Sequence, residues 1–167
     1  MIRNILLVLA FAFAVLQFFR PEKNLSNDNT NIMTNKFDVP SDIQEIFKTA
    51  CNDCHSNHTR YPWYSTIQPV AWWMNNHIID GKRHYNYAEF SGYRVSRQNE
   101  KFGDIAEQME KNEMPLPSYT LIHKDAILTD AQRKRIIDWA KANQDSLKAH
   151  YPADSLVRQR GPQGPPK

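Results

Sequence analysis

The cysteines constrain this chain more than any other feature of its sequence. Its 167 residues include only two cysteines, Cys51 and Cys54, and His55 follows the second directly. Residues at positions i and i+3 lie on the same side of a helical turn, so the two sulfur atoms can act together. A structural disulfide more often joins distant segments and closes a longer loop. The spacing therefore indicates a chemical site on one short turn.

The chemistry that fits this spacing is covalent haem attachment. Each of the two cysteines can form a thioether with one of the vinyl groups on one edge of a haem. A histidine directly after the second cysteine then lies beneath the ring and offers a nitrogen to the iron. The pattern Cys-x-x-Cys-His is typical of such attachment. We predict one haem c, bound through Cys51 and Cys54, with His55 as an axial ligand of the iron.

Two other uses of a close cysteine pair fit the sequence less well. A thioredoxin-like dithiol belongs in a βαβ context, and no such pattern of strands is visible. A zinc site needs two further ligands. His58 is close to the pair, but the chain has no second pair of cysteines.

The N-terminus is an apolar segment. Residues 5–19 are apolar except for Gln17, which is long for the core of a signal peptide and short for a membrane span. Cleavage after the small residues Ala12 and Ala14 would fall inside the apolar run. We therefore predict that residues 1–20 form a membrane anchor, with a removable signal as the alternative. Attachment of haem to c-type cytochromes takes place outside the cytoplasmic membrane, so we expect the domain on its periplasmic face, or soluble in the periplasm after signal cleavage.

The rest of the chain is divided by composition. Residues 21–38 are rich in asparagine and lack apolar periodicity, which predicts a flexible tether. A haem-binding domain is expected over residues 39–150. The tail, residues 151–167, ends in a Gly- and Pro-rich stretch, which predicts disorder.

Helical periodicity dominates the domain. Apolar residues recur at helical spacing over 41–50, 70–79, 102–112 and 129–147. Capping-box patterns mark the first and last of these helices, Ser41 with Gln44 and Thr129 with Gln132. No stretch alternates as a strand. The sequence predicts an all-α, small cytochrome c-like domain around one haem, preceded by the N-terminal anchor helix.

Met114 is the predicted second axial ligand. It lies 59 residues after His55 in Met114-Pro115-Leu116-Pro117. The prolines deny this loop helical hydrogen bonds and hold it extended, so that the thioether can face the iron. A Met/His pair raises the reduction potential relative to two histidines. Packing in the core is the alternative role for this methionine. The strongest rival ligand is His77, and the further ones are His58, His84 and His123.

Aromatic and basic residues near the motif could complete the site. The aromatic residues between positions 61 and 73 could form the apolar wall that a flat macrocycle needs, and ordinary core packing is the alternative. Arg83 is a candidate partner for the haem propionates, as are Arg60 and Lys82, with simple solvation as the alternative. The predicted wall consists of Trp63, Tyr64, Trp72 and Trp73.

These residues together resemble a known family. The motif and its surroundings are similar to the bacterial haem-binding domain family related to c-type cytochromes, over about residues 40–145. The placement of Met114 also resembles that in single-haem class I cytochromes c. The resemblance implies a haem domain more firmly than it implies a pathway. It is carried by Cys51–Tyr64, Pro69–Trp73, His77, Gly81–Arg83, Glu113–Pro115 and Trp139.

The expected function is electron transfer by a membrane-tethered monohaem cytochrome. Its partners would be redox proteins, as yet unidentified. The net charge of +3 comes from scattered basic residues, which gives no indication of nucleic-acid binding. No separate catalytic constellation is visible, so we do not expect an enzyme. The alternative is a haem-based sensor or ligand-binding module with an open or labile sixth site, and peroxidase-type activity is a third option.

Overall fold

The computed structural model describes residues 1–157, and these residues are helical with irregular connections. They contain no β-strand, only an isolated antiparallel bridge between Leu25 and His58. The predicted all-α class is thus confirmed. In chain order the elements are α1 (Ile2–Leu16), η1 (Met33–Asn35), α2 (Ser41–Ala50), α3 (Asn52–His55), η2 (Trp63–Thr66), α4 (Val70–His84), η3 (Tyr87–Gly92), α5 (Val95–Glu110), α6 (Pro117–Thr120), η4 (Lys124–Ala126), α7 (Asp130–His150) and α8 (Ala153–Leu156).

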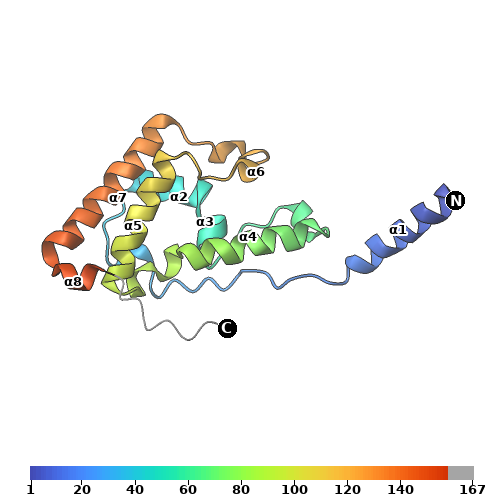
Figure 1. Ribbon diagram of the computed structural model, residues 1–167, viewed down its shortest axis with the longest axis horizontal. Helices are drawn as coiled ribbons and strands as arrows, with labels where there is room; N and C mark the ends of the chain where they lie inside the picture. The colour runs from blue at the N-terminus through green and yellow to red at the C-terminus, as the bar shows by residue number, and fades with distance from the viewer. Residues whose placement is uncertain (158–167) are drawn as a thin grey trace, which may run out of the picture.

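Two long helices form one side of the domain. Helices α5 and α7 pack along each other, and α8 closes against both (Figure 1). Helix α4 leads away from this pair, and the short helix α3 with the cysteine motif packs against it. The chain end that carries α1 projects from the domain beyond the start of α4. The motif thus lies between α4 and the α5–α7 pair.

Aromatic rings join these helices into one core. Phe47 of α2, Phe90 of η3 and Phe102 of α5 are fully buried. Trp139 of α7 meets the edges of Phe47 and Phe102, each with ring centroids 5.5 Å apart. Such edge-to-face pairs add about 0.5–1.5 kcal/mol each beyond the apolar area they bury. The indole nitrogen of Trp139 donates to the carbonyl oxygen of Asp38 at 2.9 Å, so its one polar group is satisfied.

Two of the predicted helices are longer than expected. Helix α4 continues past residue 79 to His84, and α5 begins at Val95, well before residue 102. The first turns of α5 lack apolar periodicity because Gln98 is buried there as a polar residue. Its side-chain nitrogen donates to the carbonyl oxygen of Phe90 at 3.1 Å, and its oxygen accepts from Lys36 at 2.8 Å.

The two capping-box predictions had different outcomes. Thr129 and Gln132 form a complete box at the start of α7. The box predicted at Ser41 was wrong, because Ser41 is already the first residue of α2 and Pro40 precedes it without a side-chain cap. Gln44 instead donates to the carbonyl oxygen of Val39 at 2.7 Å.

Residues 21–38 do not behave as the predicted tether, because much of this segment packs on the domain. The side chain of Asn24 donates to the carbonyl oxygen of Ser56 at 2.9 Å and accepts from Lys82 at 2.8 Å. Met33 is fully buried in the core. Asparagine-rich composition suggested solvation, yet here an asparagine side chain supplies the hydrogen bonds that hold the segment down.

The two chain ends also differ from the prediction. Helix α1 forms where the anchor was expected, but no helix within residues 1–157 is long and apolar enough to cross a membrane. At 1.5 Å per residue, the 15 residues of α1 cover about 22 Å of a bilayer core about 30 Å thick. In the predicted disordered tail, Leu156 of α8 packs against the core. Residues 158–167 of that prediction lie outside the described residues.

A glycine permits the close contact between α3 and α4. A Cβ atom on Gly81 would lie 2.5 Å from the carbonyl oxygen of Cys54. The obstacle is backbone of the cysteine motif, which cannot swing aside as a side chain can. Any larger residue at position 81 would therefore push the motif away from α4.

We predict that Gly81→Ala lowers the free energy of unfolding by about 1–3 kcal/mol, the usual cost of overpacking. Denaturant unfolding of the purified holoprotein measures this. Gly103→Ala is the matched control, because its Cβ would meet only the side-chain nitrogen of Gln144, at 2.9 Å. That side chain can shift without moving the backbone, at the expense of its hydrogen bond to the Asn99 carbonyl oxygen at 3.0 Å. Alanine is favoured over glycine inside a helix, which offsets this loss, so the control should unfold at about the same denaturant concentration. Equal destabilisation by both substitutions would contradict the close-contact argument.

Candidate functional site

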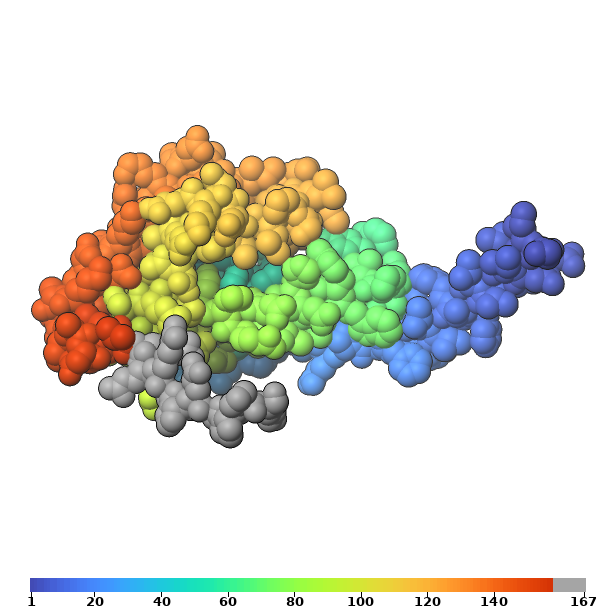
Figure 2. Space-filling model, in the orientation of Figure 1, coloured from blue at the N-terminus to red at the C-terminus, as the bar shows by residue number. Residues whose placement is uncertain are grey.

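The cysteine motif lies beside an apolar cavity of about 540 Å³. This volume falls within the range of small-molecule and cofactor sites, about 300–1,000 Å³. In the space-filling view a hollow opens between α4, α5 and the segment around α6, with teal atoms of the α2–α3 region at its base (Figure 2). Its apolar lining comes from Phe47, Ala50, Ile105, Met109, Leu116 and Ile136, and Cys51, Cys54 and His55 also line it.

The two cysteines are free thiols that both reach this cavity. Cys51 follows the last residue of α2, and Cys54 lies within α3. The pKa of Cys51 is raised to about 12, mainly by burial and to a smaller extent by the neighbouring Cys54. The pKa of Cys54 is raised to about 11, mainly by burial and to a smaller extent by the charge of Asp53. Both sulfur atoms are therefore protonated near neutral pH and uncharged in an apolar site.

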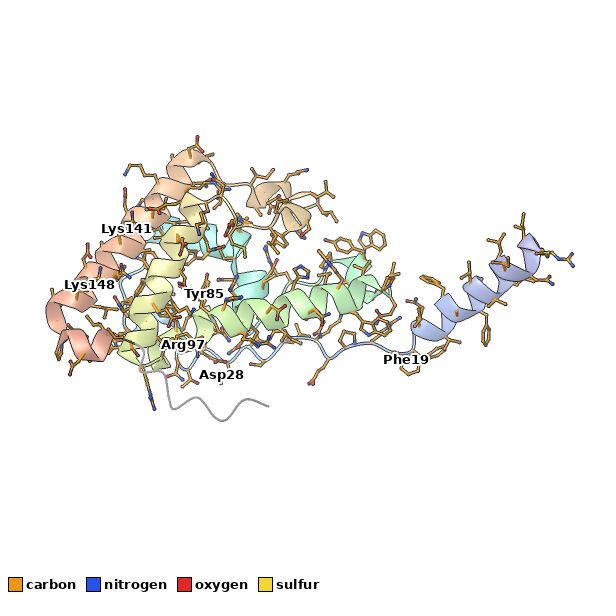
Figure 3. The ribbon with its side chains drawn as sticks, viewed as in Figure 1. Phe19, Asp28, Tyr85, Arg97, Lys141 and Lys148 are labelled. Atoms are coloured by element: carbon orange, nitrogen blue, oxygen red, sulfur yellow. The ribbon has the colours of Figure 1, made fainter. Side chains whose placement is uncertain are left out.

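His55 is oriented by a backbone carbonyl. Its Nδ1 lies 3.2 Å from the carbonyl oxygen of Tyr85, and its ring stacks on the Tyr85 ring at 4.4 Å with a 14° interplanar angle. A carbonyl oxygen can only accept, so Nδ1 carries the proton and Nε2 keeps its lone pair. Burial lowers the pKa of His55, which favours the neutral, ligating form. Tyr85 lies near the centre of the domain, where the end of α4 meets α5 (Figure 3). Metal-bound histidines almost always donate their second ring nitrogen to such an acceptor, as the Nδ1 of His55 does to the Tyr85 carbonyl oxygen.

Met114 reaches the same cavity from the proline-containing loop. It is half-buried and packs against the hydrophobic core. The guanidinium of Arg133 donates to the Met114 carbonyl oxygen at 2.7 Å, which fixes the loop backbone to α7. The structure thus brings together residues far apart in sequence, with Cys51, Cys54, His55 and Met114 around one apolar space.

The rival histidines are distributed between three places. His77 and His84 of α4 both line the cavity. His123 lines a smaller neighbouring cavity of about 70 Å³ and meets the Tyr64 hydroxyl at 3.1 Å. His58 is exposed and lines neither of these two cavities.

The predicted aromatic wall does not line the main cavity. Trp63 is 78% exposed, and Trp72 and Trp73 are also exposed. Tyr64 and Trp73 line the smaller cavity instead. High aromatic density in the sequence does not say which side of a helix faces inward. The wall comes from apolar residues at helical spacing in other helices, a signal that the sequence did contain: Phe47, Ile105, Met109 and Ile136.

The basic residue predicted for the propionates lies elsewhere too. Arg83 is exposed, pairs with Asp80 at 3.1 Å and does not line the cavity. Arg60 and Lys82 are likewise engaged, with Asp53 and Asn24 respectively. Lys101 is the only lysine or arginine that lines the cavity among residues 1–157, and it is itself paired with Glu100 and Asp104.

Asp53 is a further residue of the site, and no pattern in the sequence pointed to it. It occupies one of the two variable positions of the motif and is only 6% exposed. Its carboxylate binds the Arg60 guanidinium at two points, 3.0 and 3.1 Å, and accepts from the Tyr119 hydroxyl at 2.7 Å. Burial and the bond to Asp53 raise the pKa of Tyr119, so its hydroxyl stays a donor.

The residues around the cavity fit a haem. Two uncharged thiols, an imidazole with a free Nε2 and a thioether surround a space whose lining is mostly apolar. Charged side chains also line it: Asp80, Lys101, Asp104 and Glu107. In a comparison with known families, a model described as a haem-binding domain matches residues 11–142, which supports haem as the ligand. No curated protein and no solved structure matches the chain.

A charged side chain introduced into the apolar part of the cavity should prevent haem from binding there. We predict that Ile105→Glu abolishes most haem incorporation, because it replaces part of the apolar lining, on which the macrocycle would pack, with a carboxylate that is costly to bury there. Ile79→Glu is the control, since Ile79 is on α4, is 45% exposed and does not line the cavity. A pyridine haemochrome assay per mole of purified protein compares the two. Equal haem content in both variants would show that the cavity is not the site.

Proposed function

The chain belongs to the haem-binding domain family, and from that membership we propose that it is a c-type monohaem protein that transfers electrons. The observation that carries the proposal is the grouping of Cys51, Cys54, His55 and Met114 around one apolar cavity. The two cysteines would hold the haem covalently, and His55 and Met114 would hold its iron. When bound, the haem supplies a metal centre that accepts and releases one electron at a time.

The roles of the protein residues follow from the contacts. The Tyr85 carbonyl oxygen holds the His55 imidazole in the tautomer that leaves Nε2 free. Arg133 fixes the backbone of Met114. With both ligands in place no position is left for a substrate, which favours electron transfer over catalysis. A thioether ligand also stabilises the reduced state, so Met114 would raise the potential.

A haem-based sensor is the second candidate. It is favoured by one observation, that His77, His84 and Met114 all line the cavity, so more than one side chain is available for the sixth position. A labile or open sixth site would suit ligand binding, and also a peroxidase-type reaction. Substitution of the individual ligands separates these functions.

We predict that Met114→Ala shifts the ferric protein toward high spin and tightens cyanide binding about tenfold or more. A competing bond worth only about 1.4 kcal/mol already changes an affinity tenfold. The reduction potential should fall, while covalent haem content stays the same. Electronic absorption spectra, cyanide titration and redox titration measure these changes, and His77→Ala is the matched control that should leave the spin state unchanged.

Other outcomes would each point to a different site. If His77→Ala opens the site and Met114→Ala does not, two histidines bind the iron. If neither substitution changes the spectrum, the native iron is already five-coordinate, and the sensor or peroxidase function replaces electron transfer.

We also propose that the protein works at the periplasmic face of the cytoplasmic membrane, near its redox partners. No side chain of α1 is buried in the domain, which leaves a helix of apolar residues exposed. Gln17, which follows α1, accepts from the Gln68 backbone at 3.0 Å, and this bond ties α1 to the domain near η2. The exposed ring of Trp63 lies on η2, and tryptophan is enriched at membrane–water interfaces. These features support a membrane-associated segment.

Cell fractionation tests this location. We predict that the full-length holoprotein sediments with the membrane fraction and keeps its N-terminal residues, because its apolar segment stays in lipid. A variant with residues 1–20 replaced by a cleavable export signal should be soluble and still carry haem. Recovery of the natural protein in the soluble fraction with a shortened N-terminus would instead identify the segment as a signal peptide.

A further inference from the structure

A buried carboxylate, Asp53, lies inside the cysteine motif and pairs with the half-exposed Arg60, on the side that the main cavity does not use. Asp53 does not line the main cavity, although both cysteines of the motif do. Its carboxylate accepts from Arg60 at three points, the backbone nitrogen at 3.1 Å and two guanidinium nitrogens at 3.0 and 3.1 Å. The backbone carbonyl oxygen of Asp53 accepts from the Thr59 hydroxyl at 2.6 Å. Asp53 thus fixes the attachment turn to the residues that follow it.

One further donor reaches this carboxylate from a distant part of the chain. The Tyr119 hydroxyl donates to the second carboxylate oxygen of Asp53 at 2.7 Å. Tyr119 belongs to α6, which begins directly after the Met114–Leu116 loop. Its ring packs against the core and stacks on His123 at 4.2 Å with a 15° interplanar angle. The hydrogen bond therefore connects the cysteine motif to the segment that carries the candidate sixth ligand.

From this geometry we propose that Tyr119 is a positioning residue, which holds the Met114 loop at the haem through the Asp53 carboxylate. The inference rests on the proposed ligation by Met114. Arg133 fixes the loop at Met114 itself, and Tyr119 fixes it five residues later, so the loop is held at both ends. The two hydrogen bonds connect the loop to different parts of the protein. Arg133 attaches it to α7, whereas Tyr119 attaches it to the cysteine turn that would hold the haem.

The strength of this hold comes from the charge on its acceptor. Hydrogen bonds to a charged group are stronger than neutral ones, and Asp53 is nearly inaccessible to water that could compete. Arg60 balances the buried carboxylate, so the acceptor is fixed in place as well as charged. Loss of the hydroxyl would leave the loop attached to α7 by Arg133 and would remove its hydrogen bond to the cysteine turn.

The test is Tyr119→Phe in the full-length holoprotein, with Tyr64→Phe as the matched control. The Tyr64 hydroxyl lies in the same region, 3.1 Å from the His123 Nε2, and it is not among the groups that donate a hydrogen bond to Asp53. Both variants remove one hydroxyl from a partly buried ring. For Tyr119→Phe we expect a weaker near-infrared charge-transfer band per haem in the ferric protein, and imidazole binding about tenfold tighter, the order set by one hydrogen bond to a charged group. Tyr64→Phe should match the natural protein in both.

Asp53→Asn is a second variant, which keeps the shape of the side chain and removes its charge. It should change the band and the imidazole affinity in the same direction as Tyr119→Phe. All values are expressed per covalently bound haem, so a lower yield of holoprotein does not affect the comparison.

Each result decides the question. If the natural protein shows the charge-transfer band and Tyr119→Phe keeps it with unchanged imidazole affinity, the positioning role is overturned while ligation by Met114 stands. If both tyrosine variants lose the band equally, the effect is general loosening of the region, which also overturns it. If the natural protein lacks the band, Met114 is not the ligand, and this inference fails together with the proposed ligation, whereas haem attachment is judged separately from the covalent haem content.

Discussion

The contact between the cysteine turn and α4 is the constraint on which the rest of the structure depends. Gly81 lets the backbone of Cys54 approach α4 closely, and the chain that leaves α4 brings the Tyr85 carbonyl oxygen to the His55 imidazole. One close approach therefore fixes both the place of the two thiols and the orientation of the imidazole. The α5–α7 pair then supplies the remaining apolar wall, and the loop after α5 supplies Met114.

The two sides of the cysteine turn have separate tasks. One side presents Cys51, Cys54 and His55 to an apolar cavity, where an uncharged thiol and a neutral imidazole are favoured. The other side presents Asp53 to a polar network with Arg60 and Tyr119. A buried carboxylate costs stability unless it is paired and hydrogen-bonded, and here it has both kinds of partner. The variable position that Asp53 occupies in the motif thus contributes to the structure of the site.

The sequence indicated which residues meet at the cavity better than it indicated what surrounds them. The helical class, the spacing of the cysteines and the capping box at Thr129 followed from local patterns, and the structure also brings Met114 to the cavity. The aromatic wall failed because Trp63 and Trp72 face outward, and sequence density does not determine orientation. The tether failed because Asn24 makes long-range hydrogen bonds. Contacts between polar side chains far apart in the chain have no periodicity, so the Asp53–Tyr119 bond was beyond local analysis.

The central claim is that the two cysteines carry one haem. Mass spectrometry of a tryptic digest tests it most directly, because cleavage after Lys48 and Arg60 releases residues 49–60 with the whole motif in one peptide. The account predicts that this peptide carries the mass of one haem and that neither cysteine reacts with an alkylating agent. Recovery of the peptide with two free thiols, from protein purified with its cofactor, would contradict it.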